Sequence, residues 1–477
     1  MTALEQELNQ QGSPVRTMRS NLRLASVAAL VVCLALLGLV LIRRSVDFPV
    51  YYLAGRSLLR GSIDLYSPGF SGGPLQDYRY PPVFVLIFSP LSTLPYQFAA
   101  YLWYSLSVGG VIMSVVALRR FIEHGQLVAG SHKIVLAEVW IIALLTTGPY
   151  FVLALHYGNV HPIVIVLLFG SFYLALRNRS AVAGLLMALA VTIKLTPLVI
   201  LPYFALKRQW KFLCAVGVFL VAINLLPAVY FGPRKNWELL QTWYHHVVVN
   251  QGFHELNTAV NLSLKGQLRR YLTRVDYAQR VTTDRDYPAV NLASLDPQSV
   301  NRLWQLFALV ISVSTLILIW WTSRPTRARL VERDGPPCQK PDRQGGQPDP
   351  GHLMSKVESA EHTRRFAPGS QTFLELGLMI CLMLLVAPLT IKIYFTALLW
   401  PTVALARLEL VRPPTRYALP ALAILNCVLS LLPGSSTQRL LLVVGVDFYV
   451  NCIIMALLAY AMIASEHRGG AALASRP

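Results

Sequence analysis

Leu24–Ile42, with the sequence LASVAALVVCLALLGLVLI, is followed directly by Arg43 and Arg44. The segment contains 19 residues and no charged side chain. A membrane-spanning helix needs about 20 apolar residues, whereas the apolar core of a signal peptide is shorter and precedes a small-residue cleavage site. We therefore expect Leu24–Ile42 to be an uncleaved first membrane span.

The composition of the whole chain excludes a soluble enzyme. Of the 477 residues, 55% are hydrophobic and only 14% are charged, whereas about a quarter of the residues of an average soluble protein are charged. The formal net charge is +19, but the basic residues fall mostly between apolar runs, so we expect no nucleic-acid partner. The six cysteines are scattered without the spacing of a disulfide framework or a zinc site.

Further apolar segments predict the fold. Basic clusters lie between several of them, and the positive-inside rule places these clusters on the cytoplasmic face. The loops 43–80, 156–161, 232–302 and 388–392 then share the opposite face. We predict an all-α polytopic membrane protein with about 11–13 transmembrane or partly spanning helices. The further segments are 97–118, 134–155, 162–176, 212–231, 303–321, 373–387, 393–406, 417–433 and 440–463.

One apolar stretch is too short for the number of crossings that its flanks require. Basic residues at 177–179 and 207–208 are predicted to lie on the same face, but two full crossings need roughly 40 residues. We therefore expect two shortened helices, Ala181–Ile193 and Leu195–Leu206, which meet at a proline-induced bend. Lys194 would lie at the tip of this bend, inside the membrane. Broken helices usually line a cavity.

The domain boundaries follow from the same segments. We predict a cytoplasmic tail, a catalytic membrane module with outer loops 43–80 and 232–302, a linker, a group of C-terminal transmembrane helices and a second tail. The linker is rich in Pro, Gly, Gln, Asp and Arg, a composition typical of disorder. The corresponding residues are 1–23, 24–321, 322–372, 373–463 and 464–477.

The stretch after the first span carries the most informative polar residues. Val46-Asp47-Phe48-Pro49-Val50-Tyr51-Tyr52 begins an aromatic loop that ends at Tyr78-Arg79-Tyr80-Pro81-Pro82. Pro49 favours the first turn of a short helix that runs to about Leu59, which places Asp47 before the positive end of that helix. One interpretation is that Asp47 only complements the helix dipole and that Asp64 starts a turn. The other is that these carboxylates are functional.

Several stretches in this order resemble glycosyltransferase family 87. They are Asp47-Phe48 with Tyr51-Tyr52 and Tyr80-Pro81-Pro82, Gly158-Asn159, Lys194-Leu195-Thr196-Pro197, Asn261-Leu262-Ser263-Leu264 and Ala387-Pro388-Leu389-Thr390. The family consists of membrane enzymes of the GT-C class that use polyprenyl-phosphate sugars as donors. The resemblance covers residues 24 to about 406 and implies a GT-C-like fold.

The resemblance implies a catalytic role for Asp47. The aspartate after the first span acts in the family as the general base, because an acceptor hydroxyl must lose its proton as it attacks the sugar. Asp64 is our second candidate. A lipid phosphate leaves in this reaction, so its negative charge requires fixed cations. Lys194 is the best candidate, although it could instead be a lysine that snorkels from a helix end. Arg79, Arg56 and Lys392 could add charge or contact lipid headgroups.

We also expect a set of polar and aromatic side chains to bind substrate. The chain departs from the family at one point, because many members have a Trp-x-His-His motif in the late loop where this chain has Ile391-Lys392-Ile393-Tyr394. A histidine role there cannot be transferred, and Lys392 and Tyr394 are its candidate replacements. The candidate substrate-binding residues are Tyr51, Tyr52, Tyr80, Asn159, His156, Asn261 and Tyr394.

The sequence therefore predicts a glycosyltransferase of the plasma membrane with its active site on the extracytoplasmic face. It would move a hexose, by resemblance mannose, from a polyprenyl phosphate to a glycolipid or cell-envelope glycan, with inversion. We expect no cofactor, and the sequence does not indicate a divalent metal. One alternative is a transporter or flippase, in which Glu138, Lys194 and Asp447 line an ion path. Another is a catalytically inactive protein of the same fold.

Overall fold

The computed structural model describes residues 32–61, 64–66, 78–124, 133–250, 260–274, 287–323, 370–409 and 417–474. These residues form helices and no strand. Five helices are long and apolar enough to cross a membrane, and six apolar helices are shorter. The prediction of an all-α polytopic membrane protein is therefore confirmed. Most of the predicted linker and the first part of Leu24–Ile42 lie outside the described residues, and Val32–Leu41 is helical.

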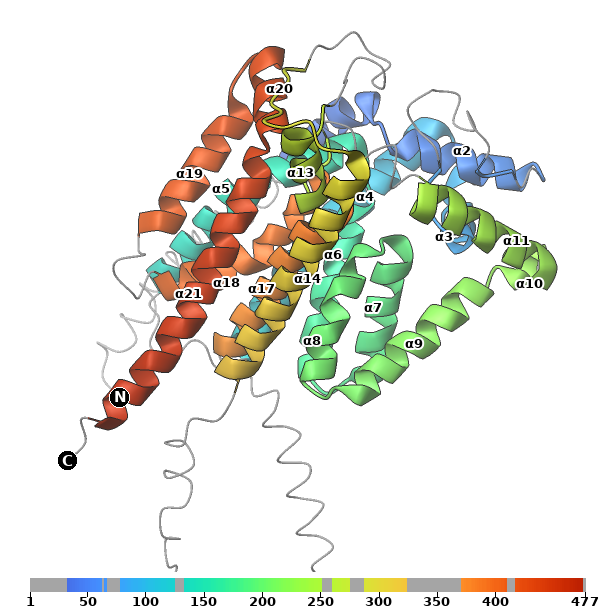
Figure 1. Ribbon diagram of the computed structural model, residues 1–477. Coiled ribbons are helices and arrows are strands. Elements are labelled where there is room, and N and C mark those ends of the chain that lie inside the picture. The colour runs from blue at the N-terminus through green and yellow to red at the C-terminus, as the bar shows by residue number, and fades with distance from the viewer. Residues whose placement is uncertain are drawn as a thin grey trace, which may run out of the picture.

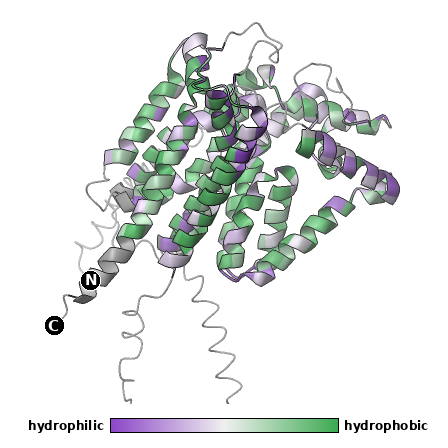
Figure 2. Cartoon of the chain, viewed as in Figure 1, coloured by the Kyte–Doolittle hydropathy of each residue, from purple (hydrophilic) through white to green (hydrophobic). Residues whose placement is uncertain are grey.

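Figure 1 shows the long helices packed side by side in a bundle, with short helices gathered at its upper end. The long helices run alternately toward and away from that end, which we call the outer end. Figure 2 shows that hydrophobic residues predominate along them. The helices of the bundle are α4 (Tyr96–His124), α5 (Lys133–Tyr157), α6 (His161–Leu176), α7 (Ser180–Ile193), α9 (Trp210–Leu225), α14 (Pro297–Thr322), α17 (Ser370–Val386), α18 (Leu399–Glu409), α19 (Ala418–Leu431) and α21 (Val446–Ala474).

The predicted pair of shortened helices is confirmed. α7 ends at Ile193, and Lys194 adopts an extended backbone with φ −141° and ψ 123°. A 3-10 helix, η3 (Thr196–Ile200), and the short helix α8 (Leu201–Leu206) follow, and they run in the direction opposite to α7 (Figure 1). The bend places Lys194 at the tip of a hairpin, at the outer end of the bundle.

Three predicted segments differ from the structure. The segment 440–463 divides into α20 (Ser435–Val444) and α21, because Gly445 between them has a φ of +83° and ends the first helix. The segment 393–406 begins as a 3-10 helix, η6 (Lys392–Leu398), before it continues as α18. The tail predicted at 464–477 is helical as far as Ala474. Apart from these three, the proline-flanked run 81–95, which we expect to fall short of a full crossing, forms only α3 (Pro82–Phe88) and η2 (Leu91–Thr93).

Short helices cover the outer end of the bundle. α2 (Phe48–Leu59) packs against α3, and α11 (Pro233–Trp243) packs against α3 from another side. Figure 2 shows hydrophilic residues gathered on α11. Its apolar residue Leu239 is buried in an aromatic cluster with Tyr51 and Tyr80. α10 (Ala228–Phe231), η4 (Tyr244–Asn250) and α13 (Leu264–Leu272) complete this layer, and η1 (Ile42–Arg44) precedes α2.

The four loops predicted to share one face meet in this layer. The backbone amide of Val46 donates to the carbonyl oxygen of Tyr157 at 3.1 Å, which joins the first loop to the second. The indole of Trp243 donates to the carbonyl oxygen of Arg79 at 3.2 Å. Asn261 donates through its side chain to the carbonyl oxygen of Pro388 at 3.0 Å. Hydrogen bonds thus tie segments that are far apart in the sequence into one surface.

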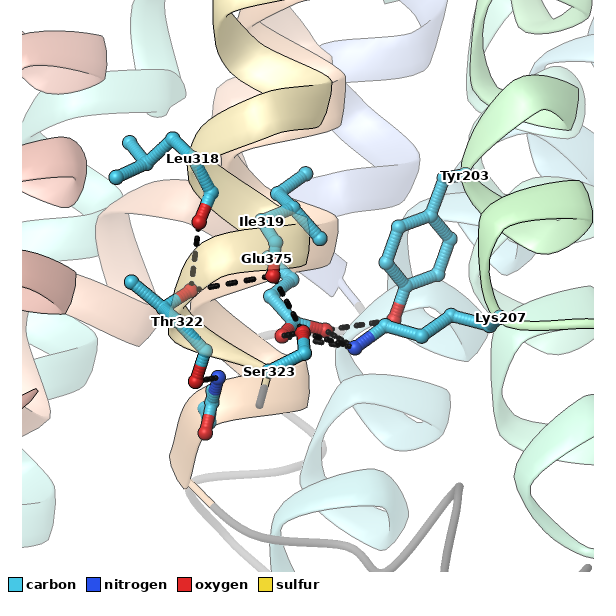
Figure 3. Close-up of polar contacts among 8 residues, drawn as sticks. Tyr203, Lys207, Leu318, Ile319, Thr322, Ser323 and Glu375 are labelled. Atoms are coloured by element: carbon cyan, nitrogen blue, oxygen red, sulfur yellow. Dashed lines mark hydrogen bonds and ion pairs between the residues drawn. The ribbon is translucent and has the colours of Figure 1, made fainter. Parts of the chain in front are cut away.

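At the opposite end of the bundle, a buried carboxylate links three helices through hydrogen bonds and an ion pair (Figure 3). Glu375 on α17 is 1% exposed and forms an ion pair with Lys207 at 2.8 Å. The hydroxyls of Tyr203 and Ser323 also donate to this carboxylate, at 3.0 and 2.9 Å. A buried charge is tolerated only when it is paired and hydrogen-bonded, as it is here. The cluster therefore holds α8, α14 and α17 together below the outer end.

Candidate functional site

The backbone around Asp47 is fixed by contact with the end of α5. The amide of Asp47 donates to the carbonyl oxygen of Tyr157 at 2.8 Å. Gly158 follows with a φ of +64°, and a Cβ atom there would lie 2.8 Å from the Cβ of Phe48. The indole of Trp103 donates to the carbonyl oxygen of Gly158 at 2.8 Å. Only glycine combines this φ with such close approach, so Gly158 allows Asp47 to sit against the 157–159 turn.

The carboxylate of Asp47 does not cap its own helix. Asp47 occupies the N-cap position of α2, but its side chain accepts no hydrogen bond from the helix backbone. Instead, Oδ2 accepts a hydrogen bond of 2.7 Å from Nδ2 of Asn159. The Oδ1 atom of Asn159 accepts from the amide of His161 at 2.9 Å, which fixes the orientation of the side-chain amide. The interpretation that Asp47 only complements the dipole therefore does not account for where its carboxylate points.

The ammonium group of Lys194 lies between two tyrosines. It donates to the hydroxyl oxygen of Tyr394 at 2.7 Å and lies 4.2 Å from the centroid of that ring. The centroid of the Tyr80 ring is 5.9 Å away. Such cation–π contacts stabilise a cation that has lost part of its water. The lysine is therefore held at the outer end of the bundle by neutral groups, and its positive charge remains available to an anion.

Asp47 and Lys194 belong to one electrostatic site. Partial burial raises the pKa of Asp47 above the ordinary carboxyl value, while the hydrogen bond from Asn159 and the charges of Lys194 and Arg79 oppose this rise. Burial is also the main reason that the pKa of Tyr80 is raised to about 12, so its phenol is neutral at pH 7. The site thus combines a carboxylate, two cations and a neutral hydroxyl.

Aromatic side chains form the wall beside these charges. The hydroxyls of Tyr51 and Tyr80 are hydrogen-bonded at 2.7 Å, and their rings meet edge to face at 5.1 Å. The Tyr80 ring stacks on Phe84 at 4.4 Å. Tyr66 donates through its hydroxyl to the carbonyl oxygen of Tyr80 at 2.8 Å. These packed rings fix the position of Tyr80, which faces Lys194.

Other predicted residues lie outside this group. Asp64 is exposed, in contrast to Asp47. Arg56 is also exposed, and its guanidinium lies over the ring of Tyr52 at 5.7 Å. Tyr52 is buried and donates through its hydroxyl to the carbonyl oxygen of Leu94 at 2.8 Å. His156 is partly buried, with its ring 5.7 Å from that of Tyr157.

The side chains of Asn261 and Lys392 both bond to other residues of this chain. Asn261 is fully buried, and its side chain bonds to the backbone of Pro388, Ser263 and Thr390. These hydrogen bonds hold the late loop at residues 388–390, and they use the amide group that would otherwise bind a ligand. Lys392 forms an ion pair with Asp447 at 3.9 Å. The predicted role of Lys392 as a cation for the donor phosphate therefore competes with this ion pair.

His161, which the sequence predicts only to cap the turn after Gly158-Asn159 or to line the cavity, is a member of the site. Its ring stacks on that of Tyr394 with a centroid distance of 4.7 Å and an interplanar angle of 13°. Among the described residues, neither ring nitrogen of His161 has a hydrogen-bond partner. The signal in the sequence was its place two residues after Asn159. Its contact with Tyr394 could not be seen there, because 233 residues separate the two (394 minus 161).

The three charges of the transporter alternative lie at opposite ends of the bundle. Lys194 is at the outer end of the bundle, as is Asp447 at the start of α21. Glu138 is exposed near the beginning of α5, at the opposite end from Tyr157. Within the described part of the chain, no group of three or more His, Cys, Asp or Glu side chains could hold a metal ion.

Comparison with known proteins finds relatives among mannosyltransferases and arabinofuranosyltransferases. The chain is 29% identical over 188 residues to the polyprenol-phosphate-mannose-dependent alpha-(1-2)-phosphatidylinositol pentamannoside mannosyltransferase of Mycolicibacterium smegmatis, a match that covers 38% of this chain and 42% of the relative. It is 28% identical over 190 residues to an alpha-(1->3)-arabinofuranosyltransferase of Mycobacterium tuberculosis, which covers 38% and 41% of the two chains. The chain thus spans about two fifths of the length of these relatives. No solved structure matches it.

The model of glycosyltransferase family 87 matches residues 78–334. Asn159 and Lys194 lie within the matched residues, whereas Asp47 precedes them and Tyr394 follows them. The match covers more than half of the 477 residues, and the chain therefore belongs to glycosyltransferase family 87.

Proposed function

We propose that this protein transfers a hexose, expected to be mannose, from a polyprenyl phosphate to a glycolipid or cell-envelope glycan. The observation that carries the proposal is that Asp47, half-buried and bound by Asn159, lies within electrostatic reach of Lys194 at one end of a membrane bundle. Family membership and the mannose-dependent relative support the choice of donor. The arabinofuranosyltransferase among the relatives makes arabinofuranose the second sugar to test.

In the proposed reaction, Asp47 removes the proton of the acceptor hydroxyl as its oxygen attacks the anomeric carbon. The bond between that carbon and the phosphate oxygen breaks, and polyprenyl phosphate leaves with the bonding electron pair. A single displacement of this kind inverts the anomeric centre and requires one base. Lys194 faces the leaving phosphate, where a fixed positive charge lowers the barrier as negative charge accumulates.

The location of the site suits a donor that stays in the bilayer. Each buried CH₂ group contributes about 0.8 kcal/mol to membrane attachment, so a long polyprenyl chain does not leave the membrane. An enzyme that uses such a donor must bring its catalytic groups to the membrane boundary. The basic clusters at 177–179 and 207–208 lie at the end opposite Asp47, and the positive-inside rule then assigns the site to the extracytoplasmic face of the plasma membrane.

The test is a transfer assay with purified protein in detergent. Polyprenyl phosphates that carry labelled mannose or arabinofuranose are supplied with a glycolipid extract as the acceptor. We expect labelled glycolipid and free polyprenyl phosphate in equal amounts from the mannose donor, with an anomeric configuration opposite to that of the donor. Retention of configuration would contradict the single displacement. Movement of substrate into sealed vesicles without a covalent product would instead establish a transporter.

A further inference from the structure

The late loop between α17 and α18 carries Tyr394, the residue that holds the ammonium group of Lys194. We propose that Asp447 is a positioning residue: its ion pair with Lys392 sets the loop so that Tyr394 presents Lys194 to the donor phosphate. Asp447 lies on α21, well beyond the loop in the sequence. Neither family membership nor the relatives assign it a role.

One side of the loop is anchored by Asn261. Its Oδ1 atom accepts a hydrogen bond of 3.2 Å from the amide of Thr390, and its Nδ2 atom donates to the carbonyl oxygen of Pro388 at 3.0 Å. The amide of Leu262 donates to the carbonyl oxygen of Thr390 at 2.6 Å. These bonds fix residues 388–390. They do not reach η6, which begins at Lys392 and contains Tyr394.

The other side is anchored by Asp447. Its Oδ1 atom lies 3.9 Å from Nζ of Lys392, at the first residue of η6. The same oxygen accepts a hydrogen bond of 2.9 Å from the hydroxyl of Tyr150. Asn426 lies beside them and donates through its side chain to the carbonyl oxygen of Thr146 at 2.9 Å. Asp447 is 3% exposed, and its carboxylate is bound by Tyr150 of α5 and by Lys392 at the start of η6.

Both anchors hold residues that precede Tyr394, whose ring is buried and stacks on that of His161. The Lys392 side chain remains 24% exposed, so without the Asp447 charge its ammonium group can turn to water. Among the described residues, the ion pair of Lys392 with Asp447 is the only one that η6 forms. Its loss would free the start of η6, two positions before Tyr394. A small shift of a supporting residue can misplace a catalytic group and slow the reaction strongly. Because Asp447 acts through Lys392 and Tyr394 on the cation that faces the leaving phosphate, its loss should lower kcat more than it raises KM for the donor.

The test compares Asp447→Asn and Lys392→Met with the wild type by hydrogen exchange and by kinetics. Asparagine keeps an oxygen for the Tyr150 hydroxyl, so the variant is expected to fold. We expect exchange in residues 388–398 to become about tenfold faster in both variants, with kcat about tenfold lower and KM for the donor changed less than about threefold. The double variant should be no worse than either single one, because both remove the same contact. Lys392→Arg keeps the charge and should resemble the wild type.

Glu375→Gln is the matched control, because Glu375 is also a buried acid paired with a lysine but lies at the other end of the bundle. Because this variant lowers the stability of the whole bundle, exchange in 388–398 is compared with exchange in α14 of the same protein, and that ratio should remain as in the wild type. Wild-type exchange in both Asp447→Asn and Lys392→Met would overturn the proposal, as would equal loosening of 388–398 in Glu375→Gln. The kinetic measurement rests on the proposed function, but the exchange measurement does not. Failure of the wild type to use any sugar donor would therefore refute the proposed function while exchange still decides the role of Asp447.

Discussion

Replacing Asn159 with alanine should shift the pH dependence of the enzyme. The Nδ2 atom of Asn159 donates to the carboxylate of Asp47 at 2.7 Å and so favours its charged form. Loss of this bond raises the pKa of Asp47 further, in the same direction as its partial burial. Because the base must be ionised, the acid limb of the pH–rate profile should move to higher pH in Asn159→Ala.

The size of the effect follows from the strength of one hydrogen bond to a charged group. Such bonds contribute about 1.5–3 kcal/mol, which corresponds to a rate about 10- to 150-fold lower on the acid limb. At higher pH, where Asp47 is ionised in both proteins, most of this deficit should disappear. Any deficit in kcat/KM that persists at high pH measures the effect of losing the fixed orientation of the Asp47 carboxylate.

The assay is kcat/KM for the donor, measured in detergent across the acid limb and the plateau. Asn224→Ala is the control, because Asn224 also donates through its side-chain amide, at 2.8 Å to the carbonyl oxygen of Leu220, but lies on α9 away from the site. Its profile should coincide with that of the wild type. An Asn159→Ala profile that also coincides with the wild type would refute the role of this hydrogen bond in holding the base.

Three further substitutions test the supports of the site. Glu375→Gln leaves Lys207 without its counter-charge and should cost about 3 kcal/mol of stability, seen as a lower denaturant midpoint; an unchanged midpoint would show that the ion pair is not structural. Lys194→Met should lower kcat by about 10²–10³ in the transfer assay, since it removes the cation facing the leaving phosphate, and full kcat would exclude that role. Gly158→Ala forces a Cβ atom to within 2.8 Å of Phe48 and should reduce both thermal stability and turnover; a variant as stable as the wild type would contradict the close packing.

The hydropathy pattern predicted the helical membrane fold because membrane crossing imposes a minimum length on each apolar segment. The same constraint, applied to the basic flanks of 180–206, predicted the bend that places Lys194 at the outer end. The division at Gly445 could not be predicted in the same way. Hydropathy alone does not show where a backbone takes a positive φ inside an apolar run.

The site was predicted less completely than the fold. Proline at position 49 placed Asp47 at the start of α2, but the partner of its carboxylate is Asn159, which lies 112 residues away. Lys392 and Tyr394 were both candidates for the late loop, and the structure separates them: Tyr394 contacts Lys194, while Lys392 contacts Asp447. Such pairings depend on which helix ends meet in space, and the spacing of residues along one chain does not specify that.

The most direct test of the account compares two carboxylates that lie close in the sequence. Asp47→Asn keeps the size and the polar character of the side chain but removes the base, whereas Asp64→Asn alters an exposed residue. With purified protein and a labelled polyprenyl-phosphate sugar, Asp47→Asn should lower the single-turnover rate of transfer by at least about 10² while the melting temperature is retained, and Asp64→Asn should remain close to the wild type. Full turnover by Asp47→Asn, or a loss confined to Asp64→Asn, would contradict the assignment of Asp47 as the base.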